Sequence, residues 1–212
     1  MPRDFRKRVV FYYNKFAGFY DLSEFFRKGT RQAMVKASGC SPGDYVLEIC
    51  SGTCELALAF ARQGVQTVAV DLARDMLRIG SQKSSFNNLE FLETDALKLP
   101  FQDKSFDVVA VSLALHHMPE TVQIKVMEEM ARLARSKVIM VEWHSPNKPF
   151  YRTLKGFLIR IMDVSEHLQA WMKQDFSETC KSSGLNIIEE QILTRGFHRL
   201  TVCIPELISK SI

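Results

Sequence analysis

The sequence predicts an α/β protein built on a parallel sheet that helices cover on both faces. Two observations carry this prediction: strand-like runs alternate with helix-like segments, and the runs are almost continuously apolar. Such runs are typical of parallel strands buried on both faces. The length of 212 residues fits one domain. The expected strands cover residues 45–50, 67–70, 89–92, 107–113 and 137–142.

The helix-like segments repeat apolar residues at helical spacing, as at Val126 and Met130. Two further strand-like runs, 186–192 and 200–204, close the chain, and Gly196 lies between them. We therefore expect a terminal hairpin. The expected helices cover residues 53–62, 73–81 and 120–135.

Composition excludes several classes of protein. Hydrophobic residues make up 46% of the chain and charged residues 25%, as in folded globular proteins. No uncharged apolar run reaches the length of about 18 residues that suggests a membrane span. The basic N-terminus lacks the apolar core of a secretory signal. Five cysteines without regular spacing do not form a disulfide framework, so we expect a reducing, cytoplasmic location.

Two aromatic-rich segments, 3–20 and 148–162, lie outside the alternating core and combine helical apolar stripes with basic residues. Residues 1–36 alone carry nine Lys or Arg against three acids, a net charge of +6. Each stripe could pack on the sheet, or form a lid over a lipophilic substrate, or rest on an anionic membrane surface. We expect a single domain, 1–212, divided into an N-terminal helical lid (1–40), a cofactor-binding core (41–142), a helical insertion or lid (143–172) and a C-terminal helix and hairpin (173–212).

Polar residues follow the expected strands at the edge where open parallel sheets bind ligands. Glu48, Asp71, Asp95, Ser112 and Glu142 lie at or just after successive strand ends. A carboxylate such as Asp71 has two oxygens that can accept bonds from both hydroxyls of a ribose. Asp95 could accept a bond from an adenine amino group.

These acids argue against a nicotinamide dinucleotide and an oxidoreductase. The turn after the first strand does not read G-x-G-x-x-G, and Glu48 would stand beside a pyrophosphate that it repels. A cofactor without phosphate and with a cationic amino-acid end suits the acidic set better. S-adenosylmethionine is such a cofactor.

Several stretches of the sequence resemble those of a known family. "VLEICSGTCELALAFA", "TVAVDLARDMLRIG" and "NLEFLETDALKLPFQDKSFDVVAVSLALHHM" look like a class I S-adenosylmethionine-dependent methyltransferase of methyltransferase type 11. "FAGFYDLSEFF" and "VEWHSPNKPFYRTLKGF" resemble its ubiquinone/menaquinone C-methyltransferase branch. The resemblance implies transfer of a one-carbon group and a Rossmann-like, seven-stranded, mostly parallel sheet whose last strand is antiparallel.

The resemblance also implies residue roles. Glu48 would help to hold the methionine ammonium, Gly52 would let the backbone approach the methionine carboxylate, and Asp71 would bind the ribose. The further cofactor-binding residues that it implies are Cys50, Leu72, Met76, Asp95, Ala96, Ser112 and Leu113.

The turn "CSGTC" replaces two expected glycines with Cys50 and Cys54. Both are small, so we expect cofactor binding to be kept, although Cys54 adds bulk where glycine allows close helix–sheet packing. If either position needs a positive φ, cysteine carries local strain. C-x3-C without further ligands is a poor zinc signature, so we expect no metal. A reactive thiol at a helix N-terminus is an alternative.

Three candidate catalytic residues follow from position. His116 comes after the fourth strand, where a base for a phenol, amine or carbon acid would lie, although the quinone branch has an arginine there. Tyr20 matches a tyrosine of the branch, and His144 follows the fifth strand. The alternatives are support or packing for His116, core filling for Tyr20, a surface loop for His144, and helix capping for the adjacent His117.

The predicted function is methyl transfer to a small lipophilic acceptor, such as a quinone precursor or a phospholipid-like molecule, with peripheral membrane contact through the basic aromatic helices. The alternative is a non-catalytic S-adenosylmethionine-binding or regulatory relative with a degenerate glycine motif. A nucleic-acid partner is disfavoured because no RNA-binding module accompanies the core and the net charge is only +4. The sequence does not indicate an oligomeric state.

Overall fold

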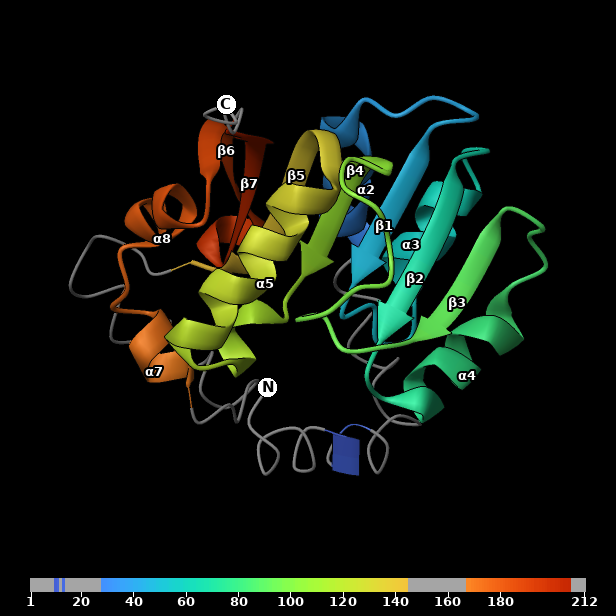
Figure 1. Cartoon of the computed structure of the whole chain (residues 1–212), viewed down its shortest axis with the longest axis horizontal. Helices are drawn as coiled ribbons and strands as arrows, with labels where there is room; N and C mark the ends of the chain where they lie inside the picture. The colour runs from blue at the N-terminus through green and yellow to red at the C-terminus, as the bar shows by residue number, and fades with distance from the viewer. Residues whose placement is uncertain (1–9, 12, 14–27, 145–166, 207–212) are drawn as a thin grey trace.

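The computed structural model describes residues 10, 11, 13, 28–144 and 167–206. Within them lies a seven-stranded sheet with the order β3-β2-β1-β4-β5-β7-β6 (Figure 1). Strands β1 to β5 run parallel to one another, and β7 runs antiparallel to both β5 and β6. The strands are β1 (Tyr45–Ile49), β2 (Gln66–Asp71), β3 (Leu89–Glu93), β4 (Phe106–Ser112), β5 (Ala134–Trp143), β6 (Leu185–Leu193) and β7 (His198–Pro205).

Helices cover both faces of this sheet. In Figure 1, α5 and α8 lie on one face, and α2 and α3 lie on the other. Helix α4 packs beside β2 and β3. The helices are α2 (Lys28–Ser38), α3 (Glu55–Ala61), α4 (Arg74–Lys83), α5 (Glu120–Leu133), α7 (Leu168–Trp171) and α8 (Phe176–Ser182), with 3-10 turns η2 (Leu115–His117) and η3 (Thr194–Gly196).

The predicted fold class is confirmed, including the antiparallel last strand. Every strand predicted from the sequence and the three predicted helices of the alternating core are present, with ends that differ by a few residues. The largest difference is at β5, which begins at Ala134 rather than residue 137, because α5 passes into this strand without a loop. The terminal hairpin turns at η3, which contains Gly196 as predicted.

The central strands are buried on both faces, which explains their continuous apolar runs. The adjacent residues Val46 and Leu47 in β1 and Val109 and Ala110 in β4, which point to opposite faces, are completely inaccessible to solvent. Parallel strands with such sequences end at one common edge of the sheet. The polar residues that follow them therefore gather at that edge.

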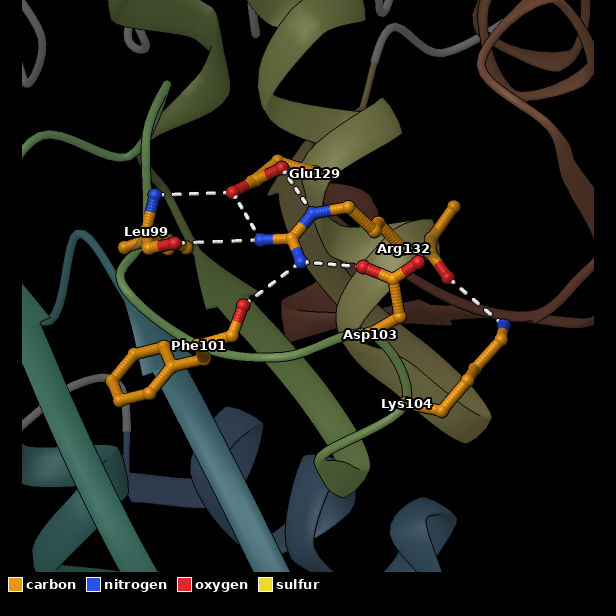
Figure 2. A network of polar contacts seen from close by, with 7 residues as sticks. Leu99, Phe101, Asp103, Lys104, Glu129 and Arg132 are labelled. Carbon is orange, nitrogen blue, oxygen red and sulfur yellow. Dashed lines mark hydrogen bonds and ion pairs between the residues drawn. The ribbon is translucent and has the colours of Figure 1, made fainter.

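The connection between β3 and β4 is fixed by one arginine of α5 (Figure 2). Arg132 donates to the carbonyl oxygens of Phe101 and Leu99 at 2.9 and 3.4 Å, and to Asp103 at 2.8 Å. Its partner Glu129, 2.6 Å away, accepts from the Leu99 N–H at 3.0 Å. This network holds the loop that continues directly from the segment containing Asp95.

Some predictions fall outside the described residues. They are Tyr20, the apolar stripe between residues 5 and 19, and segment 148–162. Of the expected N-terminal lid, helix α2 is described, and it packs against α3, β5 and β7. The helices of the described residues include none with the length and apolar character to cross a membrane.

Candidate active site

A cleft lies beyond the carboxyl ends of β1, β2 and β4. Its walls come from the turn after β1, the segments that follow β2, β3 and β4, and Thr30 and Arg31 of α2. It encloses about 1070 Å³, counting the solvent at its open mouth. All ten residues predicted to bind the cofactor line it: Glu48, Cys50, Gly52, Asp71, Leu72, Met76, Asp95, Ala96, Ser112 and Leu113.

Three carboxylates of the cleft accept hydrogen bonds from backbone N–H groups. Asp71 accepts from Gly52 N and Ala73 N, both at 2.8 Å. Glu48 accepts from Ala57 N in α3 at 2.8 Å. Asp95 accepts from the backbone N–H two residues later at 3.1 Å. These bonds fix the direction of each carboxylate before any ligand arrives.

Asp71 faces two opposing influences on its pKa. Burial raises the pKa of this carboxyl above its ordinary value, and the N–H groups of Ala73, Gly52 and Leu72 partly offset the rise. An ionised carboxylate offers about four acceptor sites. Three N–H bonds therefore leave acceptor capacity directed into the cleft.

The turn after β1 adopts the left-handed conformation that cysteine disfavours. Cys50 has φ 53°, Gly52 has φ 53° and Cys54 has φ 63°. Both cysteines therefore carry the strain predicted for a positive φ. The turn is closed by a 2.8 Å bond from Cys54 N to the Ser51 carbonyl, and Ser51 N donates to Val70 O at 3.0 Å.

Cys54 packs against a glycine of α4. A Cβ added at Gly80 would lie 2.6 Å from Cys54 Sγ and 2.8 Å from Cys54 Cβ. Atoms do not approach that closely, so the bulk at position 54 is accommodated because position 80 has no side chain. Sequence reasoning anticipated the added bulk but not the residue that makes room for it.

The two thiols of the turn are poor nucleophiles. Burial raises the pKa of Cys50 well above its ordinary value, and the nearby carboxylates of Asp71 and Asp95 raise it further. Burial and Glu48 also raise the pKa of the Cys54 thiol. Because the thiolate is the reactive form, these directions contradict the reactive-thiol alternative.

The loop after β4 is held by the buried carboxylate of Glu142. One Glu142 oxygen accepts from Ala114 N at 2.9 Å and Leu115 N at 2.7 Å, and the other lies 2.5 Å from His116 Nδ1. Leu113, with φ 53°, lines the cleft and donates its N–H to the Val141 carbonyl at 2.7 Å. Glu142 thus stabilises a loop that contains a strained residue.

Among the predicted catalytic residues, His116 and His144 are not brought to the cleft wall. His116 is 1% exposed and bound to Glu142, which agrees with the alternative that it supports the loop. His144 donates its backbone N–H to the carbonyl oxygen of Phe197, the residue that follows η3, and does not line the cleft.

His117 lies in the cleft wall instead, with its ring 5.7 Å from Tyr13 in an edge-on arrangement. The rings of His116 and His117 lie 4.0 Å apart, but His116 is bound to Glu142 and only His117 lines the cleft. The adjacent His116 and His117 indicated a histidine near the cleft, but the sequence did not indicate which of the two rings lines it. Arg31 and Glu55 also line the cleft and were not predicted.

Comparison with known proteins agrees with this geometry. A family described as "Methyltransferase domain" matches residues 46–137. The demethylmenaquinone methyltransferase of Oceanobacillus iheyensis is 27% identical over 202 residues, covering 89% of this chain and 84% of that protein. The enzyme of the same name from Renibacterium salmoninarum is 29% identical over 163 residues, covering 68% and 67%.

Solved structures show the same fold. The YcgJ protein from Bacillus subtilis is 26% identical with a TM-score of 0.61, covering 78% of this chain and 72% of that one. Magnesium protoporphyrin IX methyltransferase from Synechocystis, solved with bound S-adenosylhomocysteine, has a TM-score of 0.72 at 18% identity, covering 95% and 100%.

Together the matched domain, the sheet order and the acidic cleft define a class I S-adenosylmethionine-dependent methyltransferase. The predicted enzyme class and cofactor are confirmed, and the nicotinamide alternative is wrong. Within this class, the sequence resembles the menaquinone branch, because it is similar to proteins named demethylmenaquinone methyltransferase.

The contact between Cys54 and Gly80 predicts that the effect of Gly80→Ala on stability depends on the residue at position 54. Gly80→Ala should lower the free energy of unfolding by about 1–3 kcal/mol, because the new methyl group overlaps the thiol. In a Cys54→Gly background, the same change should lower it by less, because the overlap with the thiol is gone and only the Thr53 carbonyl oxygen, 3.1 Å from the added methyl group, remains close. Urea unfolding of the four variants measures both effects.

Gly29→Ala in α2 is the matched control, because nothing lies within 4 Å of a Cβ at that position. It should have the same effect in both backgrounds. A Gly80→Ala variant as stable as the unsubstituted protein would contradict the packing explanation.

Proposed function

We propose that the chain methylates a quinone-type acceptor. The observation that carries this proposal is the match over 89% of the chain to a relative named demethylmenaquinone methyltransferase. The apolar side of the cleft supports it, since a ring system needs such walls. Tyr13, Leu72, Met76 and Met118 provide apolar surface there.

The cofactor-binding residues follow from the positions of the carboxylates. We assign the ribose hydroxyls to Asp71, the adenine amino group to Asp95 and the methionine ammonium to Glu48. Gly52 lies in the turn that would admit the amino-acid tail, with Cys50 beside it. The remaining assignments are Leu72 and Met76 to the sugar and adenine, Ala96 to the adenine edge, and Ser112 and Leu113 to the methionine portion.

The charges of the cleft suit this cofactor. Four carboxylates, Glu48, Glu55, Asp71 and Asp95, line it. They would repel a pyrophosphate and attract a ligand that carries a sulfonium and an ammonium. When bound, the cofactor supplies an electrophilic methyl group whose leaving group is a neutral thioether. The protein therefore has to align the acceptor and exclude water rather than protonate a leaving group.

His117 is the residue that we assign to the acceptor. Its ring lines the cleft, and the Glu142 bonds to Ala114 and Leu115 fix the loop that carries it. An acceptor that loses a proton during methylation needs a base, and an imidazole is suited to that role near neutral pH.

A lipophilic acceptor also implies a location. Quinones partition into membranes, so we propose that the chain meets an anionic membrane surface through its basic aromatic segments 3–20 and 148–162. These segments contain Lys and Arg beside Phe and Tyr, the composition that suits an interfacial position.

Replacement of Asp71 tests the cofactor site. Asp71→Ala should weaken S-adenosylhomocysteine binding at least tenfold, because charge-assisted bonds of about 1.5–3 kcal/mol each are lost. Calorimetric titration measures the affinity, and circular dichroism checks that the substitution has not unfolded the protein. The control is Asp75→Ala, which removes a half-exposed carboxylate on α4. Equal affinity in the two variants would disprove the ribose assignment.

The acceptor is tested by transfer of a tritiated methyl group. Demethylated naphthoquinols and benzoquinols, presented in neutral or anionic vesicles, should be labelled, and phospholipids alone should not. Co-sedimentation with the same vesicles measures membrane contact separately. Labelling of phospholipid but not of quinol would overturn the proposed acceptor while keeping the enzyme class.

Replacement of His117 should separate catalysis from cofactor binding. His117→Ala should lower kcat for the methylated quinol at least tenfold, within the range typical of a lost general base. Its melting temperature and its affinity for S-adenosylhomocysteine should stay unchanged. His116→Ala, by contrast, should lower the melting temperature, because it leaves the buried Glu142 without its imidazole partner. A fully active His117→Ala would exclude the role of base.

A further inference from the structure

The ring of His117 is in contact with the ring of the preceding histidine. The centroids of the His116 and His117 rings lie 4.0 Å apart, with their planes inclined at 42°. Aromatic rings in proteins usually pair at about 4.5–7 Å, so this contact is close. His117 lines the cleft, whereas His116 is buried. The pair therefore joins a ring that a ligand can reach to a ring that the protein encloses.

The buried ring of His116 is held by contacts from other elements. Its Nδ1 lies 2.5 Å from Glu142 Oε2, and because an ionised carboxylate can only accept, the contact places a hydrogen on Nδ1. The indole rings of Trp143 in β5 and Trp171 in α7 lie edge-on to the imidazole, at 6.3 and 6.5 Å. Trp171 Nε1 also donates to the Trp143 carbonyl at 3.0 Å, which joins α7 to the sheet. The position of the His116 ring is therefore set by β5 and α7.

The bonds that fix the loop do not by themselves orient the His117 ring. Glu142 holds the backbone at Ala114 and Leu115, and the His117 N–H donates to the Ala114 carbonyl at 3.2 Å. The imidazole can still turn about two single bonds, with three staggered positions about the first. A fixed ring 4.0 Å away restricts these rotations, because turning toward it would make the two rings overlap.

A second ring contact reaches His117 from the N-terminal part of the chain. The Tyr13 ring lies 5.7 Å from the His117 ring and nearly perpendicular to it, at 82°. Tyr13 also packs against Ala73 and Met76, at the start of α4. The orientation of His117 is thus coupled both to the buried Glu142 pair and to the wall assigned to the sugar and adenine.

We propose that His116 is a positioning residue, whose ring keeps the His117 imidazole in the orientation that faces the acceptor. This inference rests on the proposed role of His117 and adds to it the residue that acts through it. A base must come within hydrogen-bond reach of the proton that it takes, so the orientation of its ring affects the rate. His116 would then have two separable functions: its Nδ1 bond stabilises the loop, and its ring orients the base.

Two substitutions separate the ring from the bond. His116→Asn keeps an N–H donor for Glu142 and removes the ring, whereas His116→Phe keeps a ring and removes the donor. His116→Asn should lower kcat for the quinol fivefold or more, with KM and the affinity for S-adenosylhomocysteine changed less than threefold. His116→Phe should restore kcat to within threefold of the unsubstituted protein. Its melting temperature should nevertheless fall, because the buried Glu142 loses its imidazole partner.

A double-mutant cycle distinguishes positioning from a general loss of structure. In a His117→Ala background, His116→Asn should change kcat less than twofold, because a residue that acts through another has no effect once that residue is removed. His198→Asn is the matched control, since it makes the same exchange at another buried imidazole, 4.8 Å from the Trp143 ring, that does not line the cleft. It should lower the melting temperature and change kcat less than twofold. Equal losses of kcat from His116→Asn in both backgrounds would reduce His116 to a structural residue and overturn the proposal.

The orientation of His117 can also be measured without a substrate. Three-bond NMR couplings about its χ1 should report one rotamer in the unsubstituted protein and in His116→Phe, and an average over rotamers in His116→Asn. A single, unchanged rotamer in His116→Asn would overturn the proposal whether or not the protein methylates quinols. Absence of quinol methylation by the unsubstituted protein would instead overturn the proposed function, and the couplings would then decide the positioning role alone.

Discussion

The bonds from Gly52 N and Ala73 N to Asp71 are the interaction on which the rest of the site depends. They join the end of β2 to the turn after β1, so two separate loops share one carboxylate. A buried carboxylate without such donors would be costly, and the N–H groups of a tight turn would also lack acceptors. The acid therefore shapes the cleft before it can bind a ligand in it.

The same arrangement recurs at two other strand ends. Glu48 accepts from Ala57 in α3, and Glu142 accepts from Ala114 and Leu115 after β4. In each case a carboxylate at the tip of a strand receives the N–H of a turn that belongs to another element. Glu142 is 1% exposed and acts only within the protein, whereas Glu48 and Asp71 also line the cleft. Acids at strand ends thus either hold a loop or also line the cleft, and the sequence does not show which of the two roles each acid has.

Much of the fold could be predicted because the strands are buried on both faces, which makes their apolar runs continuous. The cleft residues could be predicted because parallel strands end at one edge, so Asp71 and Asp95 had to lie near each other. Contacts between distant segments could not be predicted in this way. Arg31 reaches the cleft from a helix that precedes the sheet, and no pattern marks it. The choice between His116 and His117 depends on the direction of a single 3-10 turn, which spacing does not reveal.

The altered glycine turn is explained by packing rather than by decay of the site. Cysteine at a positive φ costs roughly 1–2 kcal/mol at each position, yet Cys50 and Cys54 both adopt it and Gly52 donates its N–H to Asp71. Space for the Cys54 side chain comes from Gly80, on the opposite side of the contact between α4 and the turn. The close approach that a glycine in the turn would provide is thus provided by a glycine in the helix. Because the turn still places Gly52 N on Asp71, loss of the glycine pattern alone is not evidence for loss of cofactor binding.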